Sequence, residues 1–313
     1  MMVARSLAEE MKSKIAGEVA SIKKESGITP KLVALLIGDD PVSRTYVDLK
    51  RKDCAEVGIS SEVIDMSHYD KDESSREILA KIKELNDDRT VNAVIPQMPF
   101  SGKVSEETLF STLSPDKDAD GLTPYRLGKL LRSEYEIERA LLPCTPKGAI
   151  LLSRYYKLSI EGADVAIIGR STLVGEPLRK LFQDLNATAT CYHTKSRHME
   201  ERLKQADIVV AAIGRPPEIY GKSGFRVTNG SVKDGASVIS IGVRKSESTG
   251  KLLFDVDTAS LKGKCSYLTP NTGGIGVMTR VCLLQNTINA TRIQIGKSST
   301  RRSLINSFNQ ERN

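Results

Sequence analysis

Residues 163–177 read Ala-Asp-Val-Ala-Ile-Ile-Gly-Arg-Ser-Thr-Leu-Val-Gly-Glu-Pro, an apolar run that stops at a glycine and resumes with the pattern of a helix. Residues 164–168 are too few and too rich in Val and Ile for a buried helix, so they are predicted to form a strand covered on both faces. Gly169 permits a tight turn, and Gly175 allows the next helix to lie close to the strand. Backbone N–H groups at such a helix start favour an anion, commonly a phosphate. By spacing alone, a strand–turn–helix without a ligand remains open, because Arg170-Ser171 departs from the G-x-G-x-x-G pattern.

The chain beyond this turn repeats strand and helix in the rhythm of a doubly wound parallel sheet. Further strands are predicted at residues 187–193, 206–214 and 236–242, and the segments between them, such as 199–205, are short and amphipathic. The fold class is therefore α/β, with residues 147–279 forming a nucleotide-binding domain of the Rossmann type.

The length of 313 residues is ample for two domains, and no apolar stretch is long enough to cross a bilayer. The N-terminal segment lacks a signal or transit pattern, which favours a cytoplasmic protein. Five scattered cysteines without a C-x-x-C pair support neither a disulfide framework nor a metal site, so we expect buried thiols and no metal.

The formal charge of +7 permits nucleic-acid binding, but aromatic residues make up only 5% of the chain and no basic, aromatic stripe appears. An anionic small molecule is the favoured partner. Part of the excess charge lies in residues 296–313, a serine-rich tail that we expect to be mobile or an additional docking element.

The N-terminal half alternates in the same way. Its apolar spacing predicts helices at 3–24, 43–57 and 72–85, the second capped by Ser43, and strands at 31–38, 61–66 and 91–95. A proline-held linker at 142–146 is expected to close this domain, followed by a crossing helix at 147–156. Near the other end of the chain, a glycine-rich loop at 268–279 leads into a helix at 280–293.

Three polar groups in the N-terminal half can carry chemistry. Tyr46 and Lys50 are four residues apart and so share a helix face, although a surface tyrosine beside a solvated lysine fits equally well. Gln97 follows a strand between two prolines, where ligand-facing residues of parallel sheets occur, or it is a plain turn residue. The loop 115–121 holds three aspartates but lacks the closing glutamate of a calcium loop.

Several of these segments together resemble one family, the bifunctional methylenetetrahydrofolate dehydrogenase/cyclohydrolases. The similarity runs in order from about residue 5 to residue 291. The matching segments are Tyr46–Lys50 with Lys52–Gly58, Gln97–Pro99, Lys117–Gly121, Pro143–Pro146, Gly169–Gly175 with Pro177, and Gly273–Gly276 with Met278–Thr279.

The resemblance implies two activities in one-carbon metabolism and purine biosynthesis: oxidation of 5,10-methylenetetrahydrofolate with NAD(P), then hydrolysis of the methenyl product to 10-formyltetrahydrofolate. It implies an N-terminal folate-binding catalytic domain of residues 1–146 plus helix 280–295. The Rossmann domain, 147–279, would face it across a cleft, and the protein would be a homodimer paired through that cofactor domain. Residues 296–313 lie outside the family pattern.

Carried onto this sequence, the resemblance makes Lys50 the catalytic lysine and Gln97 the residue that holds it. A lysine shuttles protons near neutral pH only if burial, a cation or a hydrogen-bond network tunes it. Tyr46 would stack on or hydrogen-bond the folate ring, and Asp120 would accept hydrogen bonds from the pterin. The substrate-binding set is Tyr46, Gln97, Met98, Asp120, Gly273 and Gly274.

The resemblance places Arg170 and Thr194 near the adenosine 2′-phosphate, which favours NADP over NAD. Lys195 and Arg197 add positive charge there, unless they are solvated loop residues, whereas an NAD site usually offers a carboxylate. The predicted cofactor-binding residues are Gly169, Arg170, Ser171, Val174, Gly175, Thr194, Gly214 and Gly242.

Five positions depart from the family pattern: Asn271, Thr272 and Val277 around the double glycine, and Arg126 and Arg244, where asparagine is common. These departures bear on the geometry of the folate-side loop and on the balance of the two activities. One alternative is a dehydrogenase that has lost hydrolysis, although retention of Lys50 argues against it. A more distant alternative is a non-catalytic nucleotide-binding or RNA-binding protein that uses the basic tail.

Overall fold

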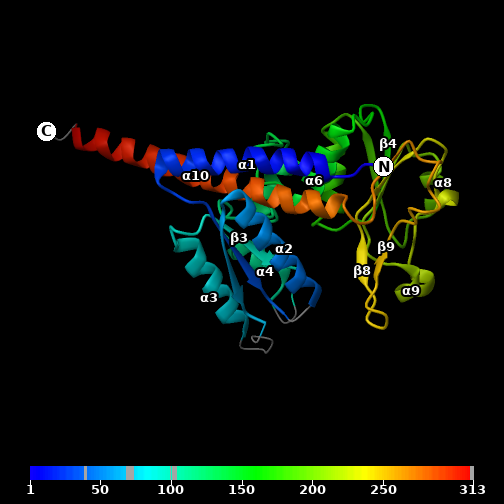
Figure 1. The fold of residues 1–313 in the computed structure, drawn as a ribbon, viewed down its shortest axis with the longest axis horizontal. Helices are drawn as coiled ribbons and strands as arrows, with labels where there is room; N and C mark the ends of the chain where they lie inside the picture. Colours follow the sequence, from blue (N-terminus) through cyan, green and yellow to red (C-terminus); the bar gives the residue numbers. More distant parts are fainter. Residues whose placement is uncertain (39–40, 68–73, 99, 101–103, 311–313) are drawn as a thin grey trace. The chain divides into compact units, whose positions relative to one another are not determined.

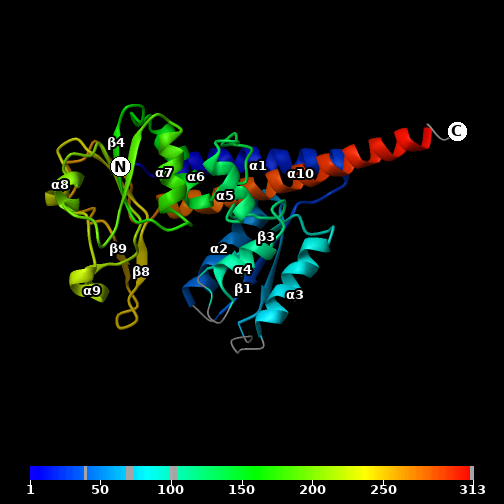
Figure 2. The same cartoon turned by 180° about the vertical axis from the view of Figure 1, so that it is seen from behind.

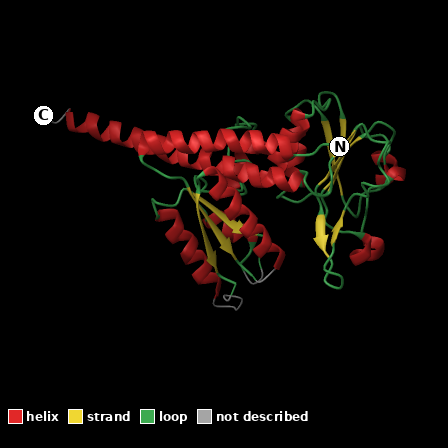
Figure 3. Cartoon of the chain, in the orientation of Figure 1, coloured by secondary structure: helices red, strands yellow, loops and turns green. Residues whose placement is uncertain are grey.

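The computed structural model describes residues 1–38, 41–67, 74–98, 100 and 104–310. The chain divides into two compact units, each built on a parallel sheet (Figures 1 and 3). The three-stranded unit comprises Met11–Leu127, Glu136–Leu142 and Leu283–Asn313, and the five-stranded unit comprises Met1–Glu10, Gly128–Tyr135 and Pro143–Cys282. No helix among the described residues is long and apolar enough to cross a membrane.

In the three-stranded unit the strand order is β2-β1-β3, and all pairs are parallel. The central strand β1 is buried at five of its six positions, as expected for its run of Leu, Val and Ala. The elements that lie wholly or partly in this unit, before the second unit begins at Pro143, are α1 (Arg5–Ser26), β1 (Lys31–Leu36), α2 (Pro41–Val57), β2 (Ser60–Asp65), α3 (Ser74–Asp87), β3 (Ala93–Gln97), α4 (Glu106–Thr112) and α5 (Pro124–Leu131).

In the five-stranded unit the order is β10-β7-β6-β4-β5, again all parallel. Figure 2 shows β4 and the β8 and β9 strands of this unit from behind. The chain leaves β4 for β5 on one side and later returns to place β6 on the other side, so the connection reverses at β4. The elements are α6 (Cys144–Tyr155), β4 (Asp164–Ile168), α7 (Gly175–Gln183), β5 (Thr188–Tyr192), α8 (Met199–Leu203), β6 (Ile208–Ala211), α9 (Pro217–Tyr220), η1 (Gly221–Ser223), η2 (Asn229–Ser231), β7 (Ser237–Ser240), β8 (Val243–Lys245), β9 (Leu252–Phe254) and β10 (Tyr267–Leu268).

Three expected boundaries are wrong. The segment 142–146 is not a linker throughout, because α6 already begins at Cys144 and accommodates Pro146 in its first turn, where a missing N–H costs nothing. Ser43 lies inside α2, which begins at Pro41, so it does not cap the helix. The last helix, α10, runs from Ile275 to Gln310 rather than from 280 to 293, so the serine-rich tail continues the helix.

Candidate functional site

Lys50 and Gln97 meet in the three-stranded unit. Lys50 lies on α2 and is only 8% exposed, and Gln97 is the last residue of β3. The Lys50 Nζ donates a hydrogen bond of 2.7 Å to Gln97 Oε1. A charged ammonium in such a buried position requires acceptors of this kind, because burial removes its hydration. The structure therefore brings the two side chains together at the carboxyl end of a parallel strand.

The Met98 carbonyl fixes the orientation of Gln97. Gln97 Nε2 donates to this carbonyl at 2.7 Å, and Ser43 Oγ donates to it at 3.2 Å. Because the amide N–H is committed to Met98, the amide oxygen faces Lys50. The Ser43 hydroxyl thus donates to the segment that follows β3 and does not cap the start of α2. Pro99, the other proline of the predicted turn, lies outside the described residues.

Residues one helical turn to either side of Lys50 extend this face of α2. Tyr46 is partly exposed, so its ring is available to a ligand. Cys54 is fully buried, and burial raises the pKa of its thiol to about 12, with the neighbouring Asp53 charge acting in the same direction. Cys54 is therefore a packing residue, whereas Tyr46 is partly accessible to solvent.

The aspartate loop runs alongside β3. Val94 forms a parallel bridge with Asp118, so Asp120 and Gln97 both lie beyond this bridge at the same end of the strand. Asp118 is completely buried and accepts hydrogen bonds from Gly121 N (2.8 Å) and Thr123 N (2.7 Å). Burial raises the Asp118 pKa, although the hydrogen bonds from Thr123 oppose the shift. Asp118 shapes the loop, whereas Asp120 is only partly buried.

Two basic residues brace the same loop. Lys117 Nζ donates to the carbonyls of Leu85 (2.7 Å) and Asp88 (2.6 Å), and burial lowers its pKa. Arg126, a departure from the family pattern, donates through Nε to Pro115 O (2.8 Å) and forms an ion pair with Asp116 at 3.3 Å. Arg126 therefore holds the start of the aspartate loop.

The glycine turn after β4 is built as the sequence predicts. Gly169 has φ 128°, and a Cβ there would lie 2.6 Å from Ala212 O in the loop after β6. A Cβ on Gly175 would lie 2.4 Å from Gly169 O. Both glycines are thus required by close backbone contacts. Ser171 Oγ accepts from the N–H groups of Val174 (3.2 Å) and Gly175 (3.5 Å), which organises the start of α7.

The predicted contacts to the 2′-phosphate are exposed. Arg170 and Thr194 are both accessible, as are Lys195 and Arg197. Gly169 N donates to Tyr192 O at 2.9 Å, so the turn lies against the end of β5, two residues before Thr194. The carboxyl ends of β4 and β5 therefore present cations and a hydroxyl to solvent, as an anionic group requires.

Asp255, which the sequence reasoning missed, links the remaining predicted glycines. Its carboxylate accepts hydrogen bonds from the N–H groups of Ile213, Gly214 and Arg215, and it lies against Gly242. The N–H groups that it accepts from lie 40 to 42 residues earlier in the sequence, so no local sequence motif indicates the contact. The only sequence signal is a carboxylate within the apolar run 252–256.

The glycine-rich loop before α10 contains two of the family departures. Gly273 has φ 78°, and a Cβ on Gly274 would lie 2.7 Å from Pro270 O. Asn271 accepts a hydrogen bond from Ser240 Oγ (2.9 Å), while Thr272 is exposed. Asn271 thereby supplies a polar connection to the end of β7.

Another of the departures from the family pattern, Arg244, lies near a second arginine. The guanidinium carbons of Arg215 and Arg244 are 4.5 Å and 5.8 Å from the centre of the Tyr220 ring. Cation–π attraction of this kind draws both side chains toward the ring. The segments that follow β6 and β7 therefore place two guanidinium groups around the Tyr220 ring.

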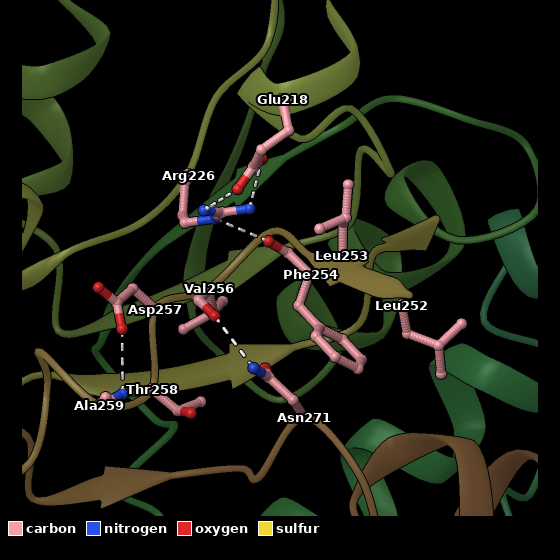
Figure 4. Close-up of a pocket in the computed structure, with 10 residues that line it drawn as sticks. All are labelled: Glu218, Arg226, Leu252, Leu253, Phe254, Val256, Asp257, Thr258, Ala259 and Asn271. Atoms are coloured by element: carbon pink, nitrogen blue, oxygen red, sulfur yellow. Dashed lines mark hydrogen bonds and ion pairs between the residues drawn. The ribbon is translucent and has the colours of Figure 1, made fainter. Parts of the chain in front are cut away.

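A hollow of about 340 Å³ lies beside the β8–β9 hairpin (Figure 4). Its arginine is already paired: Arg226 forms two hydrogen bonds with Glu218 (2.6 and 2.7 Å) and a third with Phe254 O (3.0 Å). The described lining contains none of the predicted cofactor or substrate residues. It consists of Glu218, Arg226, Leu252, Leu253, Phe254, Val256, Asp257, Thr258, Ala259 and Asn271.

Comparisons with known proteins agree on one family. Residues 2–120 match the family model "Tetrahydrofolate dehydrogenase/cyclohydrolase, catalytic domain", and residues 143–295 match the model of the NAD(P)-binding domain of the same family. The bifunctional protein FolD of Pyrobaculum aerophilum is 42% identical over 86% of this chain and 87% of its own length.

Two solved structures are similar over the whole chain. The bifunctional enzyme FolD, methylenetetrahydrofolate dehydrogenase/cyclohydrolase, from Campylobacter jejuni superposes with a TM-score of 0.84 at 32% identity, covering 94% of this chain and 98% of that one. The FolD enzyme of Trypanosoma brucei, in complex with NADP cofactor and an inhibitor, superposes with a TM-score of 0.83 at 27% identity, covering 94% and 97%.

Proposed function

The chain belongs to the tetrahydrofolate dehydrogenase/cyclohydrolase family, and we propose that it oxidises 5,10-methylenetetrahydrofolate with NADP⁺ and hydrolyses the methenyl product to 10-formyltetrahydrofolate. The observation that carries the proposal is the hydrogen bond of 2.7 Å between buried Lys50 and Gln97. An ammonium held at a strand end, in a chain that also contains an NAD(P)-binding domain, fits both activities.

The five-stranded unit fits a dinucleotide. Neither Gly169 nor Gly175 has room for a side chain, so the turn packs closely on the protein backbone and leads directly into the start of α7, the kind of helix start that accepts a pyrophosphate. NADP⁺, when bound, accepts the hydride from the folate. Arg170 and Thr194 are exposed at the strand ends and would hold the 2′-phosphate, which is the basis for proposing NADP⁺ rather than NAD⁺.

The three-stranded unit would bind the pterin and move the protons. Tyr46 supplies an accessible ring one helical turn from Lys50, and Asp120 supplies a carboxylate at the end of β3 that also carries Gln97. In hydrolysis, Lys50 Nζ would take a proton from the attacking water or return one to the departing nitrogen. Gln97 would keep Nζ in place through its own hydrogen bond to the Met98 carbonyl.

The test uses the purified protein with NADP⁺ and methylenetetrahydrofolate. Methenyl absorbance should rise as oxidation proceeds and then decay as hydrolysis follows. Lys50→Met should retain part of the oxidation and abolish the enzymatic decay, because methionine matches the length of lysine but cannot transfer a proton. A variant that hydrolyses at the full rate would refute the role given to Lys50, and an absence of both reactions in the natural protein would refute the function.

We further propose that the protein acts as a cytoplasmic homodimer that supplies one-carbon units for purine synthesis. Exposed apolar side chains on the hairpin of the five-stranded unit, Val243 (38% exposed) and Leu252 (49% exposed), support pairing through that unit. Sedimentation equilibrium should give twice the mass of the chain. A Leu252→Lys variant should shift the equilibrium toward the monomer, and a natural protein that sediments as a monomer would contradict the pairing.

A further inference from the structure

The loop after β6 lies at the edge of the sheet where a ligand of this fold would bind. In open parallel sheets, ligands lie outside the carboxyl ends of the strands where the strand order reverses, and here the order reverses between β4 and β6. The closeness of Gly169 to Ala212 O, 2.6 Å from an ideal Cβ, shows that the glycine turn and this loop touch. The conformation of residues 213–215 therefore helps to shape the dinucleotide site.

The Asp255 carboxylate accepts hydrogen bonds from the backbone of this loop, residues 213–215. Its Oδ2 accepts from the N–H groups of Ile213 and Gly214, both at 2.8 Å, and its Oδ1 accepts from Arg215 N at 3.2 Å. The Asp255 backbone N–H also donates to Gly242 O (3.1 Å), at the end of β7. One residue thus connects the loops that follow two neighbouring strands.

The fit around this carboxylate is tight. Asp255 is 1% exposed, and a Cβ on Gly242 would lie only 1.7 Å from its Oδ2. Burial raises the Asp255 pKa, and the three N–H groups oppose that rise by favouring the charged form. Burial of a carboxylate costs desolvation free energy that an apolar side chain would not incur. We therefore attribute the presence of Asp255 to the three N–H groups that it orients.

A second connection leaves the same segment. Asn271 Nδ2 donates to Val256 O at 3.2 Å, and Figure 4 shows the amide reaching this carbonyl. Asn271 lies in the glycine-rich loop, two residues before Gly273, and its Oδ1 accepts from Ser240 Oγ. Residues 255–256 therefore anchor three loops at the carboxyl edge of the sheet: 213–215, the turn at Gly242, and the start of the glycine-rich loop.

We propose that Asp255 is the positioning residue of the cofactor site, fixing residues 213–215 in the conformation that binds NADP⁺. The inference rests on the proposed function for the identity of the dinucleotide. It differs from the roles of Arg170 and Thr194, because Asp255 acts through the backbone that it orients and touches no ligand itself.

The experiment compares Asp255→Ala and Asp255→Asn with Asp257→Ala. Asp257 is a matched control, since its carboxylate lies two residues away and also accepts two backbone N–H groups, from Ala259 (3.1 Å) and Ser260 (3.2 Å), outside the cofactor loops. The readouts are the NADP⁺ dissociation constant by titration calorimetry, kcat and KM of oxidation, and the rate of methenyl hydrolysis. Hydrolysis of added methenyltetrahydrofolate consumes water but no NADP⁺. Its rate therefore reports whether the three-stranded unit is correctly folded in each variant.

Asp255→Ala should raise the NADP⁺ dissociation constant by about tenfold or more, because three N–H groups lose their acceptor. Asp255→Asn should have a smaller effect, since its amide oxygen still accepts while its NH₂ group faces a donor. Asp257→Ala should change affinity by less than about threefold, and hydrolysis should persist in all three variants.

Equal NADP⁺ affinities for the Asp255 and Asp257 variants would overturn the proposal. Parallel loss of affinity and of hydrolysis in both Asp255 variants would also overturn it, by showing a merely structural role. If Asp255→Ala fails to fold, the comparison rests on Asp255→Asn. Failure of the proposed function is seen separately, as absence of folate turnover in the natural protein, and leaves the NADP⁺ titration valid.

Discussion

Replacing Gln97 with glutamate converts the neutral partner of Lys50 into an anion of nearly the same shape. The Lys50 Nζ lies 2.7 Å from Gln97 Oε1, so a carboxylate oxygen there would contact the ammonium directly. At an effective dielectric constant of about 20 the attraction approaches about 6 kcal/mol before desolvation is subtracted. Opposite charges at such distances move a pKa by about one to three units in proteins.

This change should slow hydrolysis by trapping the proton on Lys50. If the neutral amine is the form that accepts a proton, Gln97→Glu should move the pH–rate profile of hydrolysis upward by about one to three pH units. At a fixed pH near neutrality the rate should fall by about tenfold to a thousandfold, since each unit corresponds to about 1.4 kcal/mol. The decay of methenyl absorbance, followed between about pH 6 and 9, measures the profile.

Gln97→Leu is the control, because leucine removes the acceptor without adding charge. It should lower the rate but leave the profile without the upward displacement produced by glutamate. Glutamate also replaces the N–H that bonds the Met98 carbonyl, so some loss of rate in both variants is expected. A Gln97→Glu profile that coincides with that of Gln97→Leu would refute the idea that Gln97 controls the protonation of Lys50.

Two further predictions follow from exposure and burial. Arg170→Ala should raise the KM for NADP⁺ by about tenfold or more while changing the KM for NAD⁺ by less than about threefold. The reason is that the exposed guanidinium is proposed to bind the 2′-phosphate, which NAD⁺ lacks. Equal effects on the two KM values would refute the role proposed for Arg170. At pH 8 the native Cys54 should resist iodoacetamide, since a pKa of about 12 in place of 9.0 leaves about a thousandfold less thiolate. Mass spectrometry of labelled peptides, compared with the urea-unfolded chain, measures the protection, and labelling at the unfolded rate would contradict the burial.

The parallel sheets could be predicted because their strands are short apolar runs that end at glycine or proline. β4 at residues 164–168 is predicted to the residue, and the glycine after it has the positive φ that the turn requires. Strands buried on both faces leave this continuous signature in the sequence. The same reasoning fails for the hairpin of β8 and β9, whose strands are only three residues long and whose residues are exposed or half-buried.

Helix ends were harder to predict because local signals conflict. Pro146 suggested a linker, yet proline is tolerated in a first helical turn. In α10 the serine-rich segment after Gly296 suggested an end, but the helix continues to Gln310. Glycine and serine lower helix propensity by at most about 1 kcal/mol each, which is too little to terminate a helix by itself.

The site divides into residues visible in the sequence and residues that only the fold reveals. The Lys50 and Gln97 side chains are 47 positions apart, and only the family resemblance suggested that they pair. Asp255 has no such precedent, because a carboxylate that serves distant backbone N–H groups resembles any other aspartate in sequence. The roles in binding and catalysis of Tyr46, Asp120, Arg170 and Thr194 stay predictions.

Lys50 with Gln97, and the glycine turn with Asp255, belong to different compact units of the chain. A substitution in one group is expected to leave the packing of the other unchanged. The two reactions can therefore be gained or lost separately in evolution. We therefore expect that a lineage that obtains its formyl donor elsewhere could lose hydrolysis through one codon change at position 50 and retain part of the oxidation.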